Sequence, residues 1–412
     1  MSRQKQCLRR SRFVDFSLLV PGLCLVMLML AVAADAGQFK GNIKVGVPLP
    51  LTGRHAPFGE IIKNSFVLGA DEVNAKGGVR GGYKLDLLFE DSRSDVQAAR
   101  TVTEKLINQD KVVMLTGQYS SVETFPMAQM VQQYGIPFLC STAAADQITE
   151  QGWKYIFRMV QPASEFDDGL KDFFEKVAKP KSIAILFENT LFGTSTAAAM
   201  KEWAAKNRVE AVMYEPYDAG APDYRPLLLR VKEKKADVIY MVSYLLDAVL
   251  LMRQAKEVDL NPHAFAGAAA GFSILPFIKG AGEAAENVLS STMWEASVPY
   301  PGAMNYYKDY EARFKSLPSY HGSQGYAAVF VTADVLNRAA SLKPDDIVES
   351  LSKTDMMTMY GRIRFESYKK FQNQTKLPTF VIQVQKGKFV TVWPKDVATA
   401  PALYPTPAWS KR

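Results

Sequence analysis

Short apolar segments alternate with amphipathic ones along the first third of the chain. β-Branched and aliphatic residues are concentrated at 43–47, 83–90, 112–115 and 136–139, which predicts four strands. Between these segments, apolar residues recur every three or four positions at 58–75, 96–107 and 122–134, which predicts three helices. This alternation of strand and helix predicts a doubly wound α/β sheet with helices on both faces.

The same alternation starts again in the second third of the chain. We expect strands at 183–187, 209–214, 238–242 and 264–267, and helices at 166–177, 194–206, 224–234 and 248–257. After residue 288 the order changes to three helices, 306–314, 324–340 and 345–351, followed by strands at 363–365, 380–385 and 388–393. A tail of this kind suggests that the chain returns to its first half before it crosses again.

The fold class predicted by these patterns is α/β, with two doubly wound lobes of one architecture. We expect lobe 1 to comprise residues 37–160 and 291–372, and lobe 2 to comprise residues 161–290 and 373–412.

Residues 1–36 have the composition of a secretory signal peptide. Five basic residues precede an apolar segment at 17–32, and Ala34 and Ala36 are the small residues expected before cleavage at Gly37. The apolar segment is too short to favour a membrane anchor. We therefore expect a secreted, periplasmic protein.

Removal of this segment, which carries five basic and two acidic residues, lowers the formal net charge from +7 to +4. That charge, without a basic run interleaved with aromatic residues, gives no reason to expect nucleic acid as a partner. Cys140 becomes the single cysteine of the mature chain, so no intrachain disulfide is expected. The three histidines lack metal-ligand spacing, and no nucleophile elbow or phosphate-binding loop is present. We expect no cofactor, no metal and no enzymatic activity.

Polar residues follow two neighbouring predicted strands. Ser120 and Ser121 come after the strand at 112–115, and Thr142 comes after the strand at 136–139, with Asp146 as the expected N-cap of a short helix. Carboxyl ends of parallel strands meet at one edge of a sheet, and the helices that follow them present free N–H groups suited to an anion. The alternative is that these serines only cap helices.

Several motifs in the right order resemble periplasmic leucine/isoleucine/valine-binding proteins, the type I solute-binding proteins of ABC importers. They are IKVGVPLPLTG at 43–53, FGE at 58–60, NAKGGV at 74–79, GQYSS at 117–121, TEQG at 149–152, RQA at 253–255 and GEAAE at 282–286. The resemblance covers nearly the whole mature chain. It implies two lobes joined by three hinge crossovers, with a ligand trapped between them when they close.

The resemblance also implies a ligand-binding site. Its expected members are Ser121, Thr142, Ala144, Tyr244, Phe58, Phe192, His321 and Tyr119. The Ser121 hydroxyl and backbone groups at Thr142 and Ala144 would hold the ligand's carboxylate, and Tyr244 would approach from the second lobe.

Three departures from the family pattern change this expectation. No cysteine stands near Arg93 or Ser120 where the family has a disulfide, and Ala144 replaces a ligand-binding threonine. The segment 267–271, GAAAG, lacks the acid that would pair with an α-ammonium group. The sequence therefore favours a ligand with a carboxylate and no α-ammonium, such as an aromatic or aliphatic acid, over a branched-chain amino acid. The alternative is that Asp247 or another acid binds the ammonium.

We expect this protein to be a monomer that delivers a small carboxylate to an ABC permease in the inner membrane. A ligand-sensing receptor domain of the same fold is the main alternative, and a secreted enzyme is a third.

Overall fold

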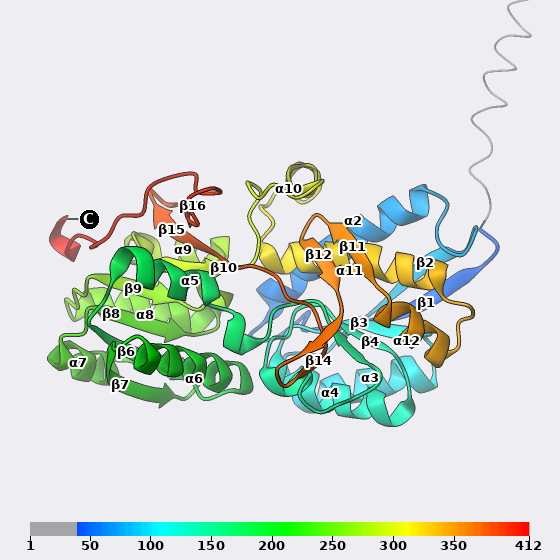
Figure 1. The fold of residues 1–412 in the computed structure, drawn as a ribbon, viewed down its shortest axis with the longest axis horizontal. Coiled ribbons are helices and arrows are strands. Elements are labelled where there is room, and N and C mark those ends of the chain that lie inside the picture. The colour runs from blue at the N-terminus through cyan, green and yellow to red at the C-terminus, as the bar shows by residue number, and fades with distance from the viewer. Residues whose placement is uncertain (1–38, 412) are drawn as a thin grey trace, which may run out of the picture.

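The computed structural model describes residues 39–411 and consists of two α/β lobes side by side (Figure 1). Each lobe is built on one seven-stranded sheet, as the two halves of the sequence pattern predicted. The expected signal peptide lies outside the described residues. No helix within residues 39–411 is long and apolar enough to cross a membrane.

The first sheet has the strand order β13-β14-β5-β4-β3-β1-β2. Its strands are β1 (Asn42–Leu49), β2 (Lys84–Asp91), β3 (Met114–Gly117), β4 (Phe138–Cys140), β5 (Ile156–Arg158), β13 (Glu366–Tyr368) and β14 (Phe371–Gln374). All its neighbouring strands are parallel except the β13–β14 pair. The carboxyl ends of β1, β3 and β4 therefore lie next to one another at one edge of the sheet.

Helices cover both faces of this sheet, with α2 and α11 on one side and α3 and α4 on the other (Figure 1). They are α2 (Ala56–Ala75), α3 (Val96–Asn108), α4 (Ser121–Tyr134), α10 (Ala303–Phe314), α11 (Tyr320–Arg338) and α12 (Pro344–Ser352). A hairpin of β11 (Asp355–Thr358) and β12 (Gly361–Arg364) follows α12.

The second sheet has the matching order β16-β15-β10-β9-β8-β6-β7. Its strands are β6 (Ser182–Glu188), β7 (Glu210–Tyr217), β8 (Val238–Val242), β9 (Ala264–Gly267), β10 (Leu289–Thr292), β15 (Phe380–Gln385) and β16 (Lys388–Trp393). Its helices are α5 (Asp168–Phe173), α6 (Leu191–Lys206), α7 (Arg225–Lys234), α8 (Leu245–Glu257) and α9 (Leu275–Ala281). The buried strands β8 and β9 lack polar alternation because helices cover both of their faces.

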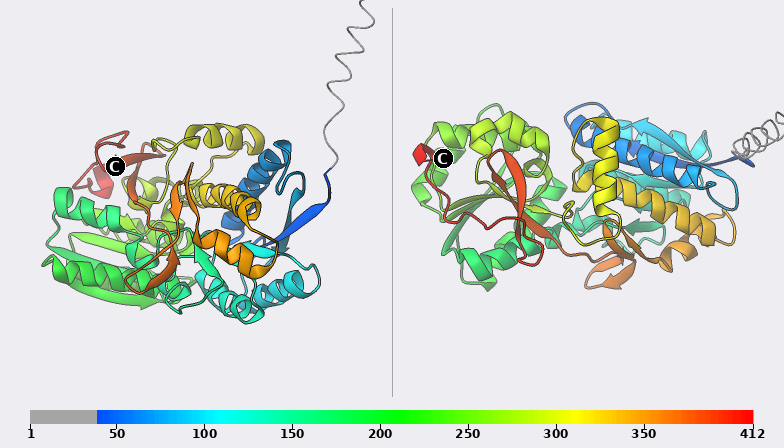
Figure 2. Two further views of the ribbon diagram at one scale, coloured as in Figure 1. Left: turned by 45° about the vertical axis from the view of Figure 1, so that its right-hand side comes forward. Right: turned by 90° about the horizontal axis from the view of Figure 1, so that it is seen from above.

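Three segments join the lobes, as the type I fold requires. The chain leaves the first sheet after β5, returns to the first lobe between β10 and α10, and crosses again between β14 and β15. Figure 2 shows from above how these segments bridge the two halves. The residue boundaries proposed for the lobes stay a proposal.

Several elements differ from the sequence prediction. The strand expected at 112–115 is Met114–Gly117, and the helix expected from 324 begins already at Tyr320. The helix expected at 166–177 is split into α5 and a π-helical turn. Strand β10 was missed because its sequence, LSST, lacks an apolar run. It is buried all the same, because it lies between β9 and β15 in the sheet, and the Ser291 hydroxyl donates a hydrogen bond to the carboxylate of Asp167.

Candidate ligand-binding site

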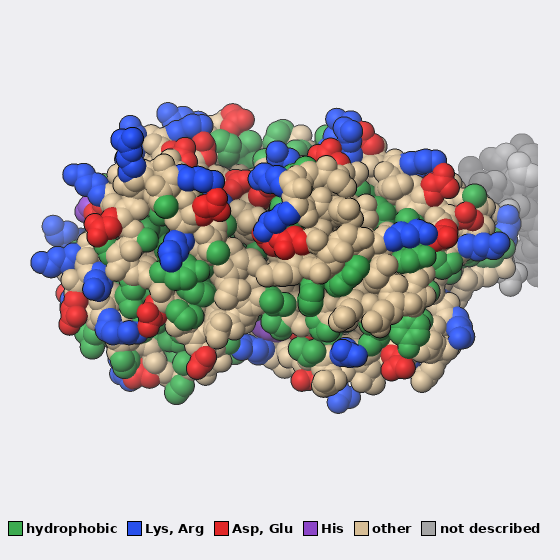
Figure 3. Space-filling model, turned by 60° about the horizontal axis from the view of Figure 1, so that its bottom comes forward, with side chains coloured by type: hydrophobic (Ala, Val, Ile, Leu, Met, Phe, Trp, Pro, Cys, Tyr) green, Lys and Arg blue, Asp and Glu red, His purple; other side chains and the backbone are tan. Residues whose placement is uncertain are grey.

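A small pocket lies between the two lobes, and ten residues line it. They are Tyr119, Ser121, Thr142, Ala144, Phe166, Phe192, Tyr244, Ala270, Tyr320 and His321. Its volume is about 20 Å³, enough for one water molecule but not for an organic acid. The lobes must therefore separate to admit a ligand of that size. Figure 3 shows one face of the molecule, on which the lobes meet at a waist.

Seven of the eight residues predicted from the sequence line this pocket. The eighth, Phe58, lies behind the lining, where its ring stacks on Tyr119 with a centroid distance of 4.4 Å and an interplanar angle of 14°. Phe58 is fully buried in α2. Phe58 thus does not line the closed pocket, although its ring contacts two lining residues, Tyr119 and His321. The ligand-binding role of all eight residues stays a prediction.

The first turn of α4 forms one end of the pocket. Ser120 is the N-cap, but its side chain makes no capping hydrogen bond, and Ser121 is the first helical residue. The Ser121 hydroxyl oxygen accepts a hydrogen bond of 3.1 Å from the backbone N–H of Ala145. Its proton therefore stays available for an acceptor in the pocket. The N–H groups of a first helical turn lack helical acceptors, so this end suits an anion.

Arg158 fixes the loop that follows β4. It is fully buried, and its guanidinium donates hydrogen bonds to the carbonyls of Ala144 (2.8 Å) and Ala145 (2.6 Å). It also donates to Thr149 and Gln374 at 2.8 and 2.6 Å. Because these carbonyls are held by Arg158, the loop has one backbone orientation toward the pocket.

The next turn corrects one expectation. Asp146 is not an N-cap: it is the first residue of a 3-10 turn whose N-cap is Ala145. Its carboxylate instead accepts a 3.0 Å hydrogen bond from the N–H of Ser164, at the start of the first crossover, and pairs with Lys370 at 3.1 Å. Asp146 thus ties the binding loop to the crossover.

Aromatic rings form the walls of the pocket. Tyr244, the N-cap residue of α8, lies 5.8 Å from Phe192 and 5.6 Å from Tyr119, measured between ring centroids. His321 lies 5.4 Å from Tyr119, and its Nδ1 is 3.3 Å from the Ser319 hydroxyl. Burial lowers the pKa of His321 to about 3, so this side chain is neutral at physiological pH.

Three residues near the pocket, Phe166, Tyr320 and His55, were missed by sequence reasoning, whereas Ala270 lies in the segment 267–271 that the family resemblance placed at the ligand. Phe166 follows the first crossover, and its ring packs 5.4 Å from Phe192. The N–H of Ala270 donates a 3.0 Å hydrogen bond to the Tyr320 hydroxyl, which closes the pocket from opposite lobes. The place of Tyr320, directly before His321, was the one signal available in the sequence.

The loop containing Ala270 is held in an unusual backbone conformation. Ala269 has φ 48° and ψ −122°, and Ala270 has φ 38°. A positive φ is unfavourable for alanine, and such strain is concentrated at functional sites. Gly271 is required here because a Cβ atom would lie 2.5 Å from the backbone carbon of Tyr244. The acid-free segment 267–271 is therefore packed directly onto the start of α8.

Among the described residues that line the pocket, none has a charged side chain. Asp247, the acid considered for an ammonium group, lies outside the lining and pairs with Arg54 at 2.9 Å. Both of its carboxylate oxygens also accept from the N–H of Gly220. Glu188 lies next to Asp247, and burial together with that neighbour raises its pKa well above the usual range.

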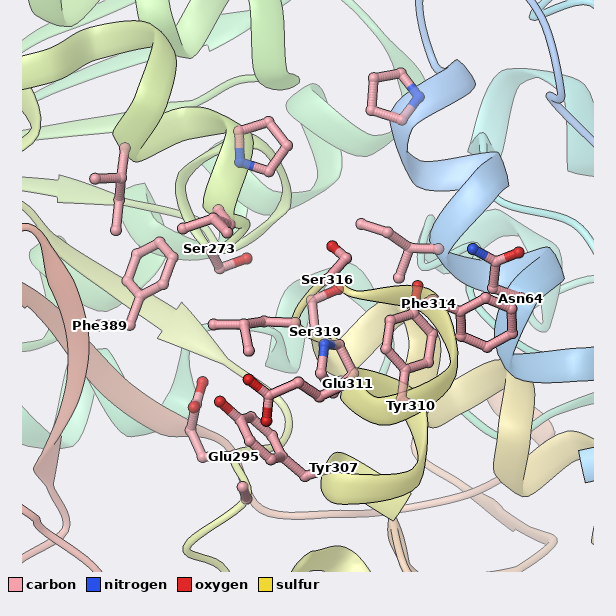
Figure 4. Close-up of a pocket in the computed structure, with 18 of the residues that line it drawn as sticks. Asn64, Ser273, Glu295, Tyr307, Tyr310, Glu311, Phe314, Ser316, Ser319 and Phe389 are labelled. Carbon is pink, nitrogen blue, oxygen red and sulfur yellow. The ribbon is translucent and has the colours of Figure 1, made fainter. Parts of the chain in front are cut away.

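A larger cavity of about 600 Å³ opens between α2, α9 and α10 (Figure 4). Its lining includes three acids, Glu60, Glu295 and Glu311, and two lysines, Lys279 and Lys388. Glu295, Glu311 and the Tyr307 hydroxyl point toward one another in Figure 4, and burial raises the pKa of Glu295 to about 7. This cavity contains neither Ser121 nor the loop after β4, so we propose the smaller aromatic pocket as the ligand site.

Comparison with known proteins shows the family to which the chain belongs. The family model "Periplasmic binding protein" matches residues 42–388. The Leu/Ile/Val-binding protein homolog 8 of Brucella abortus (strain 2308) is 30% identical over 379 residues, which cover 87% of this chain and 92% of that protein.

Solved structures share the fold. The branched-chain amino acid transporter substrate binding protein LivJ from Streptococcus pneumoniae, in complex with isoleucine, matches with a TM-score of 0.77 and 23% identity, covering 84% of this chain and 97% of LivJ. A solute binding protein of an ABC transporter from R. palustris, in complex with benzoate, also matches with a TM-score of 0.77, at 19% identity over 90% of this chain and 100% of that one. The two structures thus hold ligands of different chemistry in one architecture.

Proposed function

Because the chain belongs to the periplasmic binding protein family, among the leucine/isoleucine/valine-binding proteins, we propose that it captures a small organic carboxylate between its lobes. It then delivers the ligand to the permease of an ABC transporter in the inner membrane. It acts in the periplasm as a monomer, without a cofactor, and catalyses no reaction. Its ligand is an aromatic or aliphatic acid that has no α-ammonium group.

The uncharged lining of the pocket is the observation that carries this proposal. The Ser121 hydroxyl and the start of α4 supply hydrogen-bond donors for a carboxylate. No acid in the lining can neutralise an ammonium group, and burying an unpaired ammonium costs several kcal/mol. Phe166 and Phe192 present flat apolar surfaces that suit an aromatic or aliphatic body.

Thermal-shift screening tests the ligand class. We expect benzoate- and cinnamate-type acids to raise the melting temperature of the mature protein, and leucine, isoleucine and valine to leave it unchanged. Stabilisation by the amino acids alone would overturn the acid proposal while leaving the family assignment intact.

A branched-chain amino acid is the second candidate, and one observation favours it. Glu188 is buried, and its Oε2 atom has no hydrogen-bond partner among the described residues. Its Oε1 atom accepts a 2.6 Å hydrogen bond from the N–H of Tyr244. Glu188 could therefore turn an oxygen toward an ammonium group beside Tyr244. If so, Glu188→Gln should abolish leucine binding, whereas under our proposal it leaves the affinity for an acid within a few fold.

The same fold also serves ligand sensing, which predicts a regulatory partner in place of a permease. Co-purification of the liganded protein with its permease from detergent-solubilised membranes would favour transport, and capture of a regulatory protein instead would favour sensing. A secreted enzyme, the third alternative, would convert a bound acid into a product that mass spectrometry detects.

A further inference from the structure

Several buried polar atoms beside the pocket lack a hydrogen-bond partner within residues 39–411. Two of them belong to rings, the Nδ1 atom of His55 and the hydroxyl of Tyr119, and the others include Ser120 Oγ and Glu188 Oε2. The side chains of His55 and Tyr119 are only 4% and 5% exposed. Buried polar groups are nearly always paired, and each exception requires an explanation. Because Tyr119 also lines the pocket, a ligand atom is a natural partner.

The two atoms belong to one aromatic cluster that spans both lobes. The His55 ring lies 5.6 Å from Tyr119 and 4.5 Å from Tyr244, measured between centroids. Glu188, whose Oε2 is also unpaired, accepts a hydrogen bond from the backbone N–H of Tyr244 through its other oxygen. Side chains from lobe 1 and lobe 2 therefore bring unpaired polar atoms around Tyr244.

This cluster extends from the end of β3 toward the end of β1. Tyr119 follows β3, as Ser121 does, and His55 follows β1, whereas Thr142 and Ala144 follow β4 on the other side of β3. Neighbouring strands are about 4.8 Å apart, so the ends of β1 and β4 are separated by roughly 10 Å. A single small ligand can therefore contact both ends.

The chemistry of the unpaired atoms selects a neutral group that both donates and accepts. Burial, followed by the charge of Arg54, lowers the pKa of His55 to about 3, so its ring is neutral and each nitrogen either donates or accepts. Burial raises the pKa of Tyr119 well above its usual value, so its phenol keeps its proton. A hydroxyl can donate to one of these groups and accept from the other, whereas a methyl group leaves both unpaired.

We propose that His55 and Tyr119 form a second polar subsite for a hydroxyl group at the end of the ligand remote from its carboxylate. The ligand class is then a hydroxy-substituted carboxylate, with hydroxybenzoates as the simplest members. This inference rests on the proposed function, since it names the ligand of the same pocket.

Isothermal titration calorimetry of the mature protein with benzoate, 3-hydroxybenzoate, 4-hydroxybenzoate and 4-methoxybenzoate tests the subsite. We expect at least one hydroxybenzoate to bind tenfold or more tightly than benzoate, because a site built to bond a hydroxyl rejects analogues without one. The methoxy acid, which cannot donate, should bind more weakly than the hydroxy acid that shares its position.

Tyr119→Phe is the diagnostic variant, because it keeps the ring that stacks on Phe58 and removes only the unpaired hydroxyl. It should reduce the preference for the hydroxybenzoate over benzoate to about threefold or less. Tyr320→Phe is the matched control: its hydroxyl already accepts from Ala270, so its loss should weaken all four acids alike. His55→Phe provides a second variant of the subsite, with the same expected loss of preference.

Equal affinity for benzoate and the hydroxybenzoates would overturn the subsite and leave the proposed function standing. A preference that persists in both Tyr119→Phe and His55→Phe would also overturn it. If none of the acids binds while leucine does, the proposed ligand class fails and the subsite fails with it.

Discussion

Single residues decide whether the start of α4 is a binding site or only a helix cap. The Ser121 hydroxyl oxygen accepts a hydrogen bond from the N–H of Ala145, and this bond joins two adjacent strand ends. The hydroxyl proton of Ser121 remains free to donate. Ser120, at the N-cap itself, makes no capping bond through its side chain. The interpretation of these serines as helix caps therefore describes neither of them.

Ser121→Ala should weaken binding of the carboxylate by about 1.5–3 kcal/mol, the range for a hydrogen bond to a charged group. Calorimetry with the best acid from the thermal-shift screen measures this loss. Thr124→Val is the control, because the Thr124 hydroxyl bonds the Ser120 carbonyl at 2.7 Å in the same helix but outside the pocket. It should lower the melting temperature and leave the affinity unchanged, and unchanged affinity in Ser121→Ala would remove Ser121 from the site.

At the scale of elements, one buried carboxylate joins the apolar strand β8 to β10, which has little apolar character of its own. Asp167, just before α5, accepts hydrogen bonds from Tyr240 in β8 and Ser291 in β10. Burial raises its pKa to about 6, although these hydroxyl donors partly oppose the rise. Lobe 2 thus contains an acid whose charge is unfavourable in the folded state.

This pKa predicts a specific pH dependence of stability. The folded-state pKa of Asp167 lies above the unfolded value of 3.8. The stability that the protonated Asp167 side chain contributes is therefore complete below about pH 4 and is lost as the pH rises through about 6. Between pH 4 and pH 7 the wild type should lose on the order of 3 kcal/mol of unfolding free energy relative to Asp167→Asn, at 1.36 kcal/mol per pKa unit. Urea unfolding of both proteins at four pH values measures this difference, and parallel pH profiles would contradict it.

At the scale of the whole molecule, an ion pair joins the lobes beside the pocket. Arg54, in the loop between β1 and α2, contacts Asp247 in α8 at 2.9 Å. The Asp247 side chain is 2% exposed and that of Arg54 is 31% exposed. Separation of the lobes would break this pair and return both groups to water, so the pair favours the closed form by a modest amount.

If the lobes close around the ligand, small-angle scattering should show a smaller radius of gyration with a saturating acid than without one.

The variant Arg54→Gln tests the ion pair, because it leaves the buried Asp247 without its cation in the closed form alone. We expect this variant to bind the acid about five- to tenfold more weakly, through a shift of the equilibrium toward the open form. Lys154→Gln removes a charge from an exposed pair with Asp345 within lobe 1 and should bind normally. Identical scattering profiles at saturation would contradict a closure mechanism.

Much of this protein follows from its sequence alone. Regular spacing of apolar residues determines which segments are strands and helices, because each segment must bury one face or one stripe. The order of these elements is enough to predict two doubly wound lobes. Ser121 and Thr142 could be singled out because polar residues after parallel strands meet at one edge of a sheet.

Only the tertiary structure decided what surrounds the ligand. Phe166, Tyr320 and His55 come from separate segments of the chain, and local periodicity does not indicate that they meet. Phe58 belongs to the same neighbourhood and stacks on Tyr119 without lining the closed pocket, a distinction that depends on side-chain packing. The periodicity of apolar residues along the sequence indicates burial against a neighbouring element. Contacts between the lobes depend instead on how the three crossovers orient the two sheets relative to each other.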